Sequence, residues 1–113
     1  MNESAPSRQT WRRKMLDDLA ANDLARSTSA LLELTYDEPD RDWLENLLLK
    51  ELDEAPDPQL RSLAVTCMGH VGRLHGEVSR RIVTKLEKLL GDPSLGGIAE
   101  DALGDIRHFA TVV

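Results

Sequence analysis

Apolar residues recur along most of this chain at the spacing of one helix face. The clearest case is the stretch 60–74, where they return every three or four residues over four turns. The same spacing, interrupted by capping residues, prolines and glycines, predicts six helices that begin near residues 7, 23, 40, 57, 77 and 92. No segment alternates with a period of two for long enough to predict a strand. The expected fold class is therefore all-α.

Capping residues mark where the predicted helices begin and end. Asp40 is a good N-cap, and the pairs Asp57-Pro58 and Asp92-Pro93 each place an acid before a proline that suits a first helical turn. Gly76 and Gly91 are expected to end the fourth and fifth helices. With 113 residues, the chain fits one domain over 7–113, preceded by a flexible segment 1–6.

The predicted fourth and sixth helices repeat one another at an offset of 35 residues. Identical or similar residues at one offset predict a repeated helix pair, and hence a helical solenoid. The matched pairs are Asp57/Asp92, Pro58/Pro93, Leu60/Leu95, Leu63/Ile98, Ala64/Ala99, Met68/Leu103, Gly69/Gly104 and Val71/Ile106.

This repeat resembles the HEAT family over residues 40–110. In HEAT repeats the inner helix carries a small residue midway and a glycine about one turn later, as Ala64 and Gly69 do here, and again Ala99 and Gly104. The resemblance implies a right-handed α-α superhelix of three antiparallel helix pairs, with the helices near 23, 57 and 92 on the inner side. Because small residues allow close helix contacts, both alanines are expected to be buried.

A narrower resemblance lies in the segments 67–76 and 100–106. They are similar to a group of short bacterial HEAT-like proteins that often occur as immunity proteins beside contact-dependent or polymorphic toxins. That resemblance implies binding of a toxin C-terminal domain rather than catalysis.

The charge is negative overall and unevenly distributed. The net charge is -6, and the segment 15–57 carries 13 acids against three bases. Such a surface repels phosphate backbones and attracts basic proteins, so no direct binding of nucleic acid is expected. The longest apolar run, Leu47 to Leu49, is too short to span a membrane. We expect a cytoplasmic protein and favour a monomer.

Two groups of residues are candidate partner contacts. The first is a cluster of acids around the start of the third helix, more numerous than helix capping needs, with an aromatic residue at its edge. It consists of Tyr36, Asp37, Glu38, Asp40, Asp42 and Glu45.

The second group comprises His70, Arg73, Asp101 and Asp105, which the 35-residue offset places on facing rows of neighbouring inner helices. They form either a structural seam, with an acid in salt-bridge reach of His70 or Arg73, or a direct partner contact. His70 and His75 are five residues apart, which does not suit a helical metal pair, so neither a metal nor a cofactor is expected.

These observations favour a binding protein over an enzyme, since no catalytic arrangement is found. Cys67 lies on an apolar stripe, where a thiol is inert. The leading hypothesis is an immunity protein that covers the basic active cleft of a cognate toxin, most naturally a nuclease. The alternative is a HEAT-like adaptor or scaffold that regulates another protein.

Overall fold

The computed structural model describes residues 7–113, so the expected flexible segment 1–6 lies outside the described residues. Within 7–113 the prediction of an all-α fold with six helices is confirmed. Their bounds are α1 Arg8–Leu19, α2 Leu24–Asp37, α3 Arg41–Glu54, α4 Pro58–His75, α5 Arg80–Leu89 and α6 Gly96–Phe109.

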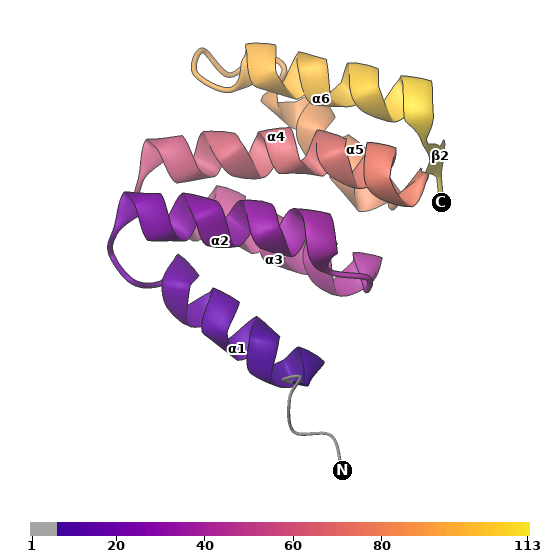
Figure 1. Cartoon of the computed structure of the whole chain (residues 1–113). Helices are drawn as coiled ribbons and strands as arrows, with labels where there is room; N and C mark the ends of the chain where they lie inside the picture. Colours follow the sequence, from indigo (N-terminus) through magenta and orange to yellow (C-terminus); the bar gives the residue numbers. More distant parts are fainter. Residues whose placement is uncertain (1–6) are drawn as a thin grey trace.

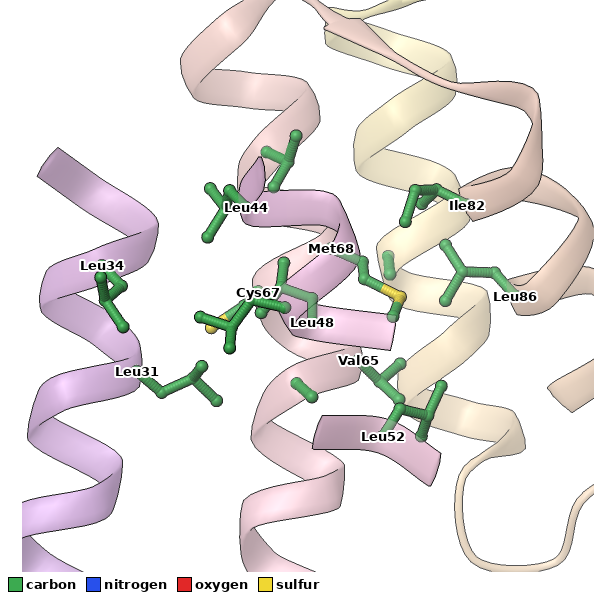
Figure 2. Close-up of a cluster of buried hydrophobic side chains, with 14 of the residues drawn as sticks. Leu31, Leu34, Leu44, Leu48, Leu52, Val65, Cys67, Met68, Ile82 and Leu86 are labelled. Carbon is green, nitrogen blue, oxygen red and sulfur yellow. The ribbon is translucent and has the colours of Figure 1, made fainter. Parts of the chain in front are cut away.

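The helices form a slab of two layers that measures 51 × 31 × 16 Å. Helices α2, α4 and α6 lie side by side in one layer, with α3 and α5 behind them, and α1 diverges from α2 at one end (Figure 1). The core fills the space between the layers and is almost wholly aliphatic (Figure 2). Its largest fully buried apolar side chains are Leu31, Leu34, Leu44, Leu48, Val65, Met68, Ile82, Leu86, Leu103 and Ile106.

Side-chain caps fix the starts of four helices, including α1, where the Ser7 hydroxyl accepts from the Thr10 amide. The carboxylates of Asp23, Asp40 and Asp57 accept hydrogen bonds from backbone amides in the first turns of α2, α3 and α4. Gly76 ends α4 in a left-handed conformation with a φ of 71°, which a residue without a Cβ adopts at little cost. These predicted boundaries are confirmed.

The expectation of no strand is wrong for four of the described residues. Glu77–Val78 (β1) and Thr111–Val112 (β2) form a short parallel pair, so α5 begins at Arg80 rather than at Glu77. The pair is closed by long-range hydrogen bonds, including one from the Val113 amide to the Val78 carbonyl at 2.9 Å. Two-residue strands carry too little alternation to be visible in the sequence.

The sixth helix also begins later than predicted, at Gly96. Asp92 does cap, but its carboxylate accepts from the amides of Ser94 and Leu95 and holds a turn before the helix. A Cβ on Gly96 would lie 2.6 Å from the carbonyl oxygen of Leu90, so the chain needs a glycine where it passes this close.

Small residues bring α4 and α6 together, as the repeat predicts. Ala64 and Ala99 are fully buried. A Cβ on Gly69 would lie 3.0 Å from the Ala102 Cα, a contact tighter than most in proteins. At the matching position of α6, a Cβ on Gly104 would meet nothing within 4 Å. Gly104 is exposed, so this position of α6 faces away from the rest of the described residues.

Candidate partner-binding surface

Glu38, one of the clustered acids, is buried and fully engaged inside the protein. Its side chain has no exposed area, and its two oxygens accept from Arg12 at 2.6 and 2.7 Å. One oxygen also accepts from the Asp40 amide at 2.8 Å. Burial alone raises the pKa of Glu38, but the hydrogen bonds from Arg12 and Asp40 outweigh it and hold the pKa below its ordinary value.

Glu45 is likewise an internal carboxylate, with no exposed area on its side chain. It accepts from the Ser79 amide at 2.9 Å and from Arg81 at 3.1 Å, while Arg41 lies 3.5 Å away. It therefore joins α3 to the start of α5. The sequence-based interpretation is that the cluster holds more acids than the fold requires. It is wrong for Glu38 and Glu45, because each accepts hydrogen bonds from partly buried donors and neither side chain is accessible to a partner in this structure.

Three acids of the cluster remain at the surface. Asp40 caps α3, as described above, and is exposed. The Asp42 side chain is 74% exposed and lies 3.7 Å from Arg41 and 3.9 Å from Arg81. Asp37, the last residue of α2, is exposed. All three are open to a partner, and of these Asp37 and Asp42 are not used as helix caps.

The predicted seam between α4 and α6 is confirmed as a contact but not as an ion pair. Asp105 faces α4, because its Oδ2 lies 3.4 Å from where a Cβ on Gly69 would stand. Across residues 7–113, however, no ion pair within 4.0 Å joins Asp101 or Asp105 to His70 or Arg73. The predicted salt bridge is wrong because the Arg73 guanidinium lies over the Phe109 ring, 5.7 Å from its centroid.

Aromatic and cationic side chains instead form a row across the layer made of α2, α4 and α6, near the C-terminal ends of these helices. The Tyr36 and His70 rings lie 5.7 Å apart, and the Phe109 ring packs edge-on against His108 at 4.5 Å. Tyr36 is 53% exposed and Phe109 50%. We call this the aromatic row and define it as Tyr36, His70, Arg73, His108 and Phe109.

Phe109, in the aromatic row, does not follow the burial that its position in the sequence predicts. The apolar periodicity places Phe109 on the core face of the sixth helix, yet it is half-exposed. Its position explains the difference, since Phe109 is the last residue of α6 and lies beyond the buried Ile106. Exposed aromatic and arginine side chains are the residue types that anchor protein interfaces.

His70 carries a lowered pKa within this row. Burial is the main cause, and the nearby positive charge of Arg73 adds to it, while Asp105 acts in the opposite direction. The lowered pKa favours the neutral form of the imidazole, and Arg73 supplies the neighbouring positive charge. Earlier on α6, in the turns before Phe109, Asp101 is exposed and Asp105 is half-buried, so acidic groups lie close to the aromatic and cationic ones.

Elsewhere in the described residues, the groups to consider are the single cysteine and possible metal ligands. Cys67 is fully buried, and burial raises the pKa of its thiol to about 11, which keeps it protonated. No group of three or more His, Cys, Asp or Glu side chains within 7–113 is arranged to hold a metal ion. In the same residues, no helix has both the length and the apolar character to cross a membrane.

Comparison with known proteins gives a match to one solved structure. A chain in the crystal structure of a CDI complex from Cupriavidus taiwanensis LMG 19424 is 32% identical to this one, with a TM-score of 0.76. The match covers 96% of this chain and 96% of the solved one. No protein-family model matches the chain, and neither does any curated protein.

Proposed function

Because this chain belongs to the same family as that component of a CDI complex, we propose that it is the immunity protein of a contact-dependent inhibition system. In this role it binds a cognate toxin domain in the cytoplasm and neutralises it without a covalent step. The observation that carries the proposal is the match along 96% of both chains. Similarity of that extent supports a common binding role more strongly than a shared fold does.

Charge supports the inhibitory role within such a complex. The chain has a net charge of -6, whereas a toxin that cleaves nucleic acid needs a basic cleft to hold phosphates. An acidic protein that covers a basic cleft excludes the substrate and associates quickly. We therefore propose a nuclease as the toxin class and occlusion of its cleft as the mechanism, with the immunity protein acting as a monomer.

We place the main contact on the aromatic row and the acids around it. Tyr36, Arg73 and Phe109 supply exposed anchors within one surface, and Asp37 and Asp101 supply exposed negative charge. Anchors of these residue types dominate the free energy of many interfaces, while charges at the rim mainly set the association rate. The row spans α2, α4 and α6, which pack side by side in one layer and so present the anchors on neighbouring helices.

We also infer that the helix pairs are HEAT-type repeats. The 35-residue offset and the close packing of Gly69 on Ala102 support this. A solenoid of this kind presents an extended surface and little enclosure, which suits binding.

Co-expression tests the function directly. A candidate toxin domain from the neighbouring genes is expressed with the chain and, in parallel, without it. We expect growth arrest without the chain, restored growth with it, and a 1:1 complex on size-exclusion chromatography. Arrested growth together with two separate elution peaks would refute the proposal.

A further inference from the structure

A hollow lies at the opposite end of α2 and α4 from the aromatic row. It has a volume of about 790 Å³ and is bounded by the end of α1, the start of α2, the end of α3 and the start of α4. It lies beside the turn that joins α1 to α2 (Figure 1). We call it the α1–α3 groove and define it by the apolar Leu16, Leu24, Leu47 and Leu60 together with Glu51 and Glu54.

The groove combines an apolar floor with an acidic rim. Leu16 is 37% exposed, which leaves part of its side chain open to an occupant. Four acids line the groove against a single base, Lys50. Asp23 and Asp57 among them are already used as helix N-caps. Glu51 and Glu54 have no such task.

The two glutamates are placed where their own helix disfavours them. Both lie in the last turn of α3, which contains no basic residue, and a negative charge at a helix C-terminus is destabilising. Asp53 in the same turn is compensated by Lys85 at 2.8 Å. In the described residues neither glutamate forms an ion pair within 4.0 Å. Burial raises the pKa of Glu51; the charge of the neighbouring Lys50 lowers it in part, and the charge of Glu54 adds to the rise.

We propose that the α1–α3 groove binds a basic segment of the partner protein that inserts one apolar side chain among its leucines. The cation supplies the missing partner for Glu51 and Glu54, and the apolar side chain covers Leu16. This inference rests on the proposed function for the identity of the partner. It adds a second contact, at the opposite end of α2 and α4 from the aromatic row.

Defined peptides test the groove without the toxin. The full chain, labelled with nitrogen-15, is titrated with a short amphipathic peptide of lysine and leucine, and separately with its glutamate–leucine counterpart. We expect the lysine peptide to shift the amide signals around Leu16, Glu51 and Glu54, and the glutamate peptide to leave them unchanged. Shifts spread over the whole surface, or equal effects of both peptides, would overturn the proposal.

Matched variants separate the groove from general charge. The double variant Glu51→Gln/Glu54→Gln should bind the lysine peptide about fivefold more weakly, since it loses two screened charge pairs. The control Glu87→Gln/Glu100→Gln removes the same charge from exposed positions on α5 and α6 and should bind as the wild type does. Equal weakening in both would overturn the proposal. So would dimerisation of the wild type that Leu16→Ser abolishes, because a second copy would then be the occupant.

Rescue from the toxin distinguishes this inference from the proposed function. Failure of the wild-type chain to protect cells, with the lysine peptide still bound in the groove, would refute the function and remove the toxin as the groove's partner. Protection by the wild type without peptide binding at the groove would refute the groove alone. If both hold, the Glu51→Gln/Glu54→Gln variant should bind the toxin more weakly than the Glu87→Gln/Glu100→Gln control.

Discussion

Arg12 and Glu38 form a bidentate ion pair that joins α1 to the residue that follows α2. The Arg12 nitrogens lie 2.6 and 2.7 Å from the two carboxylate oxygens, and the Glu38 side chain is completely buried. The same guanidinium lies over the Trp43 ring, 4.3 Å from its centroid. One arginine thus links α1, the loop after α2 and α3. Since α1 also forms a wall of the groove, this pair helps to hold the groove open in its present shape.

Replacing Glu38 by alanine should destabilise the fold by about 3 kcal/mol, because the change leaves Arg12 without its partner in a largely enclosed site. Urea unfolding followed by circular dichroism measures the effect. Asp17→Ala, on the exposed side of α1, is the control and should change stability by less than about 0.5 kcal/mol. Equal stability of both variants would show that the pair contributes little to holding α1.

The same carboxylate should make stability depend on pH on the acid side. The pKa of Glu38 in the folded protein lies below its ordinary value of 4.5. Its contribution is therefore complete above pH 4.5 and is lost as the pH falls through the lower, folded pKa. We expect the free energy of unfolding to fall with pH in this window, and to fall less steeply in Glu38→Gln. Parallel pH profiles for the two proteins would argue against the assignment.

The two glycines at matching repeat positions should respond in opposite directions to alanine. Gly69→Ala pushes a methyl group to 3.0 Å from the Ala102 Cα, and overpacking of this kind costs about 1–3 kcal/mol. Gly104→Ala meets nothing within 4 Å and should stabilise α6 by about 1 kcal/mol through helix propensity. Melting temperatures measure both changes. Destabilisation by Gly104→Ala would indicate that another surface packs on the outer side of α6.

The predictable parts of this fold are those with a local cause. Asp40 and Asp57 cap helices through amides two or three residues away, and the repeat fixes Gly69 beside the next inner helix. The role of Glu38 cannot be predicted from neighbouring residues, because its partner Arg12 lies 26 residues earlier in the chain. A count of charges in the sequence treats the Glu38 carboxylate as one more acid of the cluster. Its ion pair with Arg12 becomes visible only in the folded structure.

The candidate site was partly predictable for the same reason. The offset correctly brings His70 and Asp105 to neighbouring helices, because it depends on repeat phase alone. The offset does not predict whether Arg73 contacts an acid or an aromatic ring. That contact depends on the end of α6, where Phe109 is exposed and lies beneath the Arg73 guanidinium. The β1–β2 pair, which closes beside this helix end, also forms through tertiary contacts that no local pattern contains.

Toxin binding should respond differently to loss of anchors and loss of charge. Tyr36→Ala and Phe109→Ala each remove a half-exposed ring from the aromatic row. If these rings are anchors, each variant should dissociate from the toxin at least about tenfold faster, with little change in the association rate. Leu90→Ala, which trims another exposed apolar side chain on a different surface, is the control. Unchanged dissociation rates for both ring variants would place the interface elsewhere.

Reversal of the exposed acids should instead slow association. The double variant Asp37→Lys/Asp42→Lys changes the two exposed acids of the cluster that are not helix caps and spares Glu38 and Glu45, whose buried ion pairs the fold needs. Asp40 is also spared because it caps α3. If a basic cleft attracts this surface, the association rate of the variant should fall about tenfold at low salt, and the difference from wild type should shrink as salt is added. Surface plasmon resonance at two ionic strengths measures both effects. Equal association rates at low salt would exclude these two acids as the steering charge and leave Asp101 and Asp105, beside the aromatic row, as the next acids to reverse.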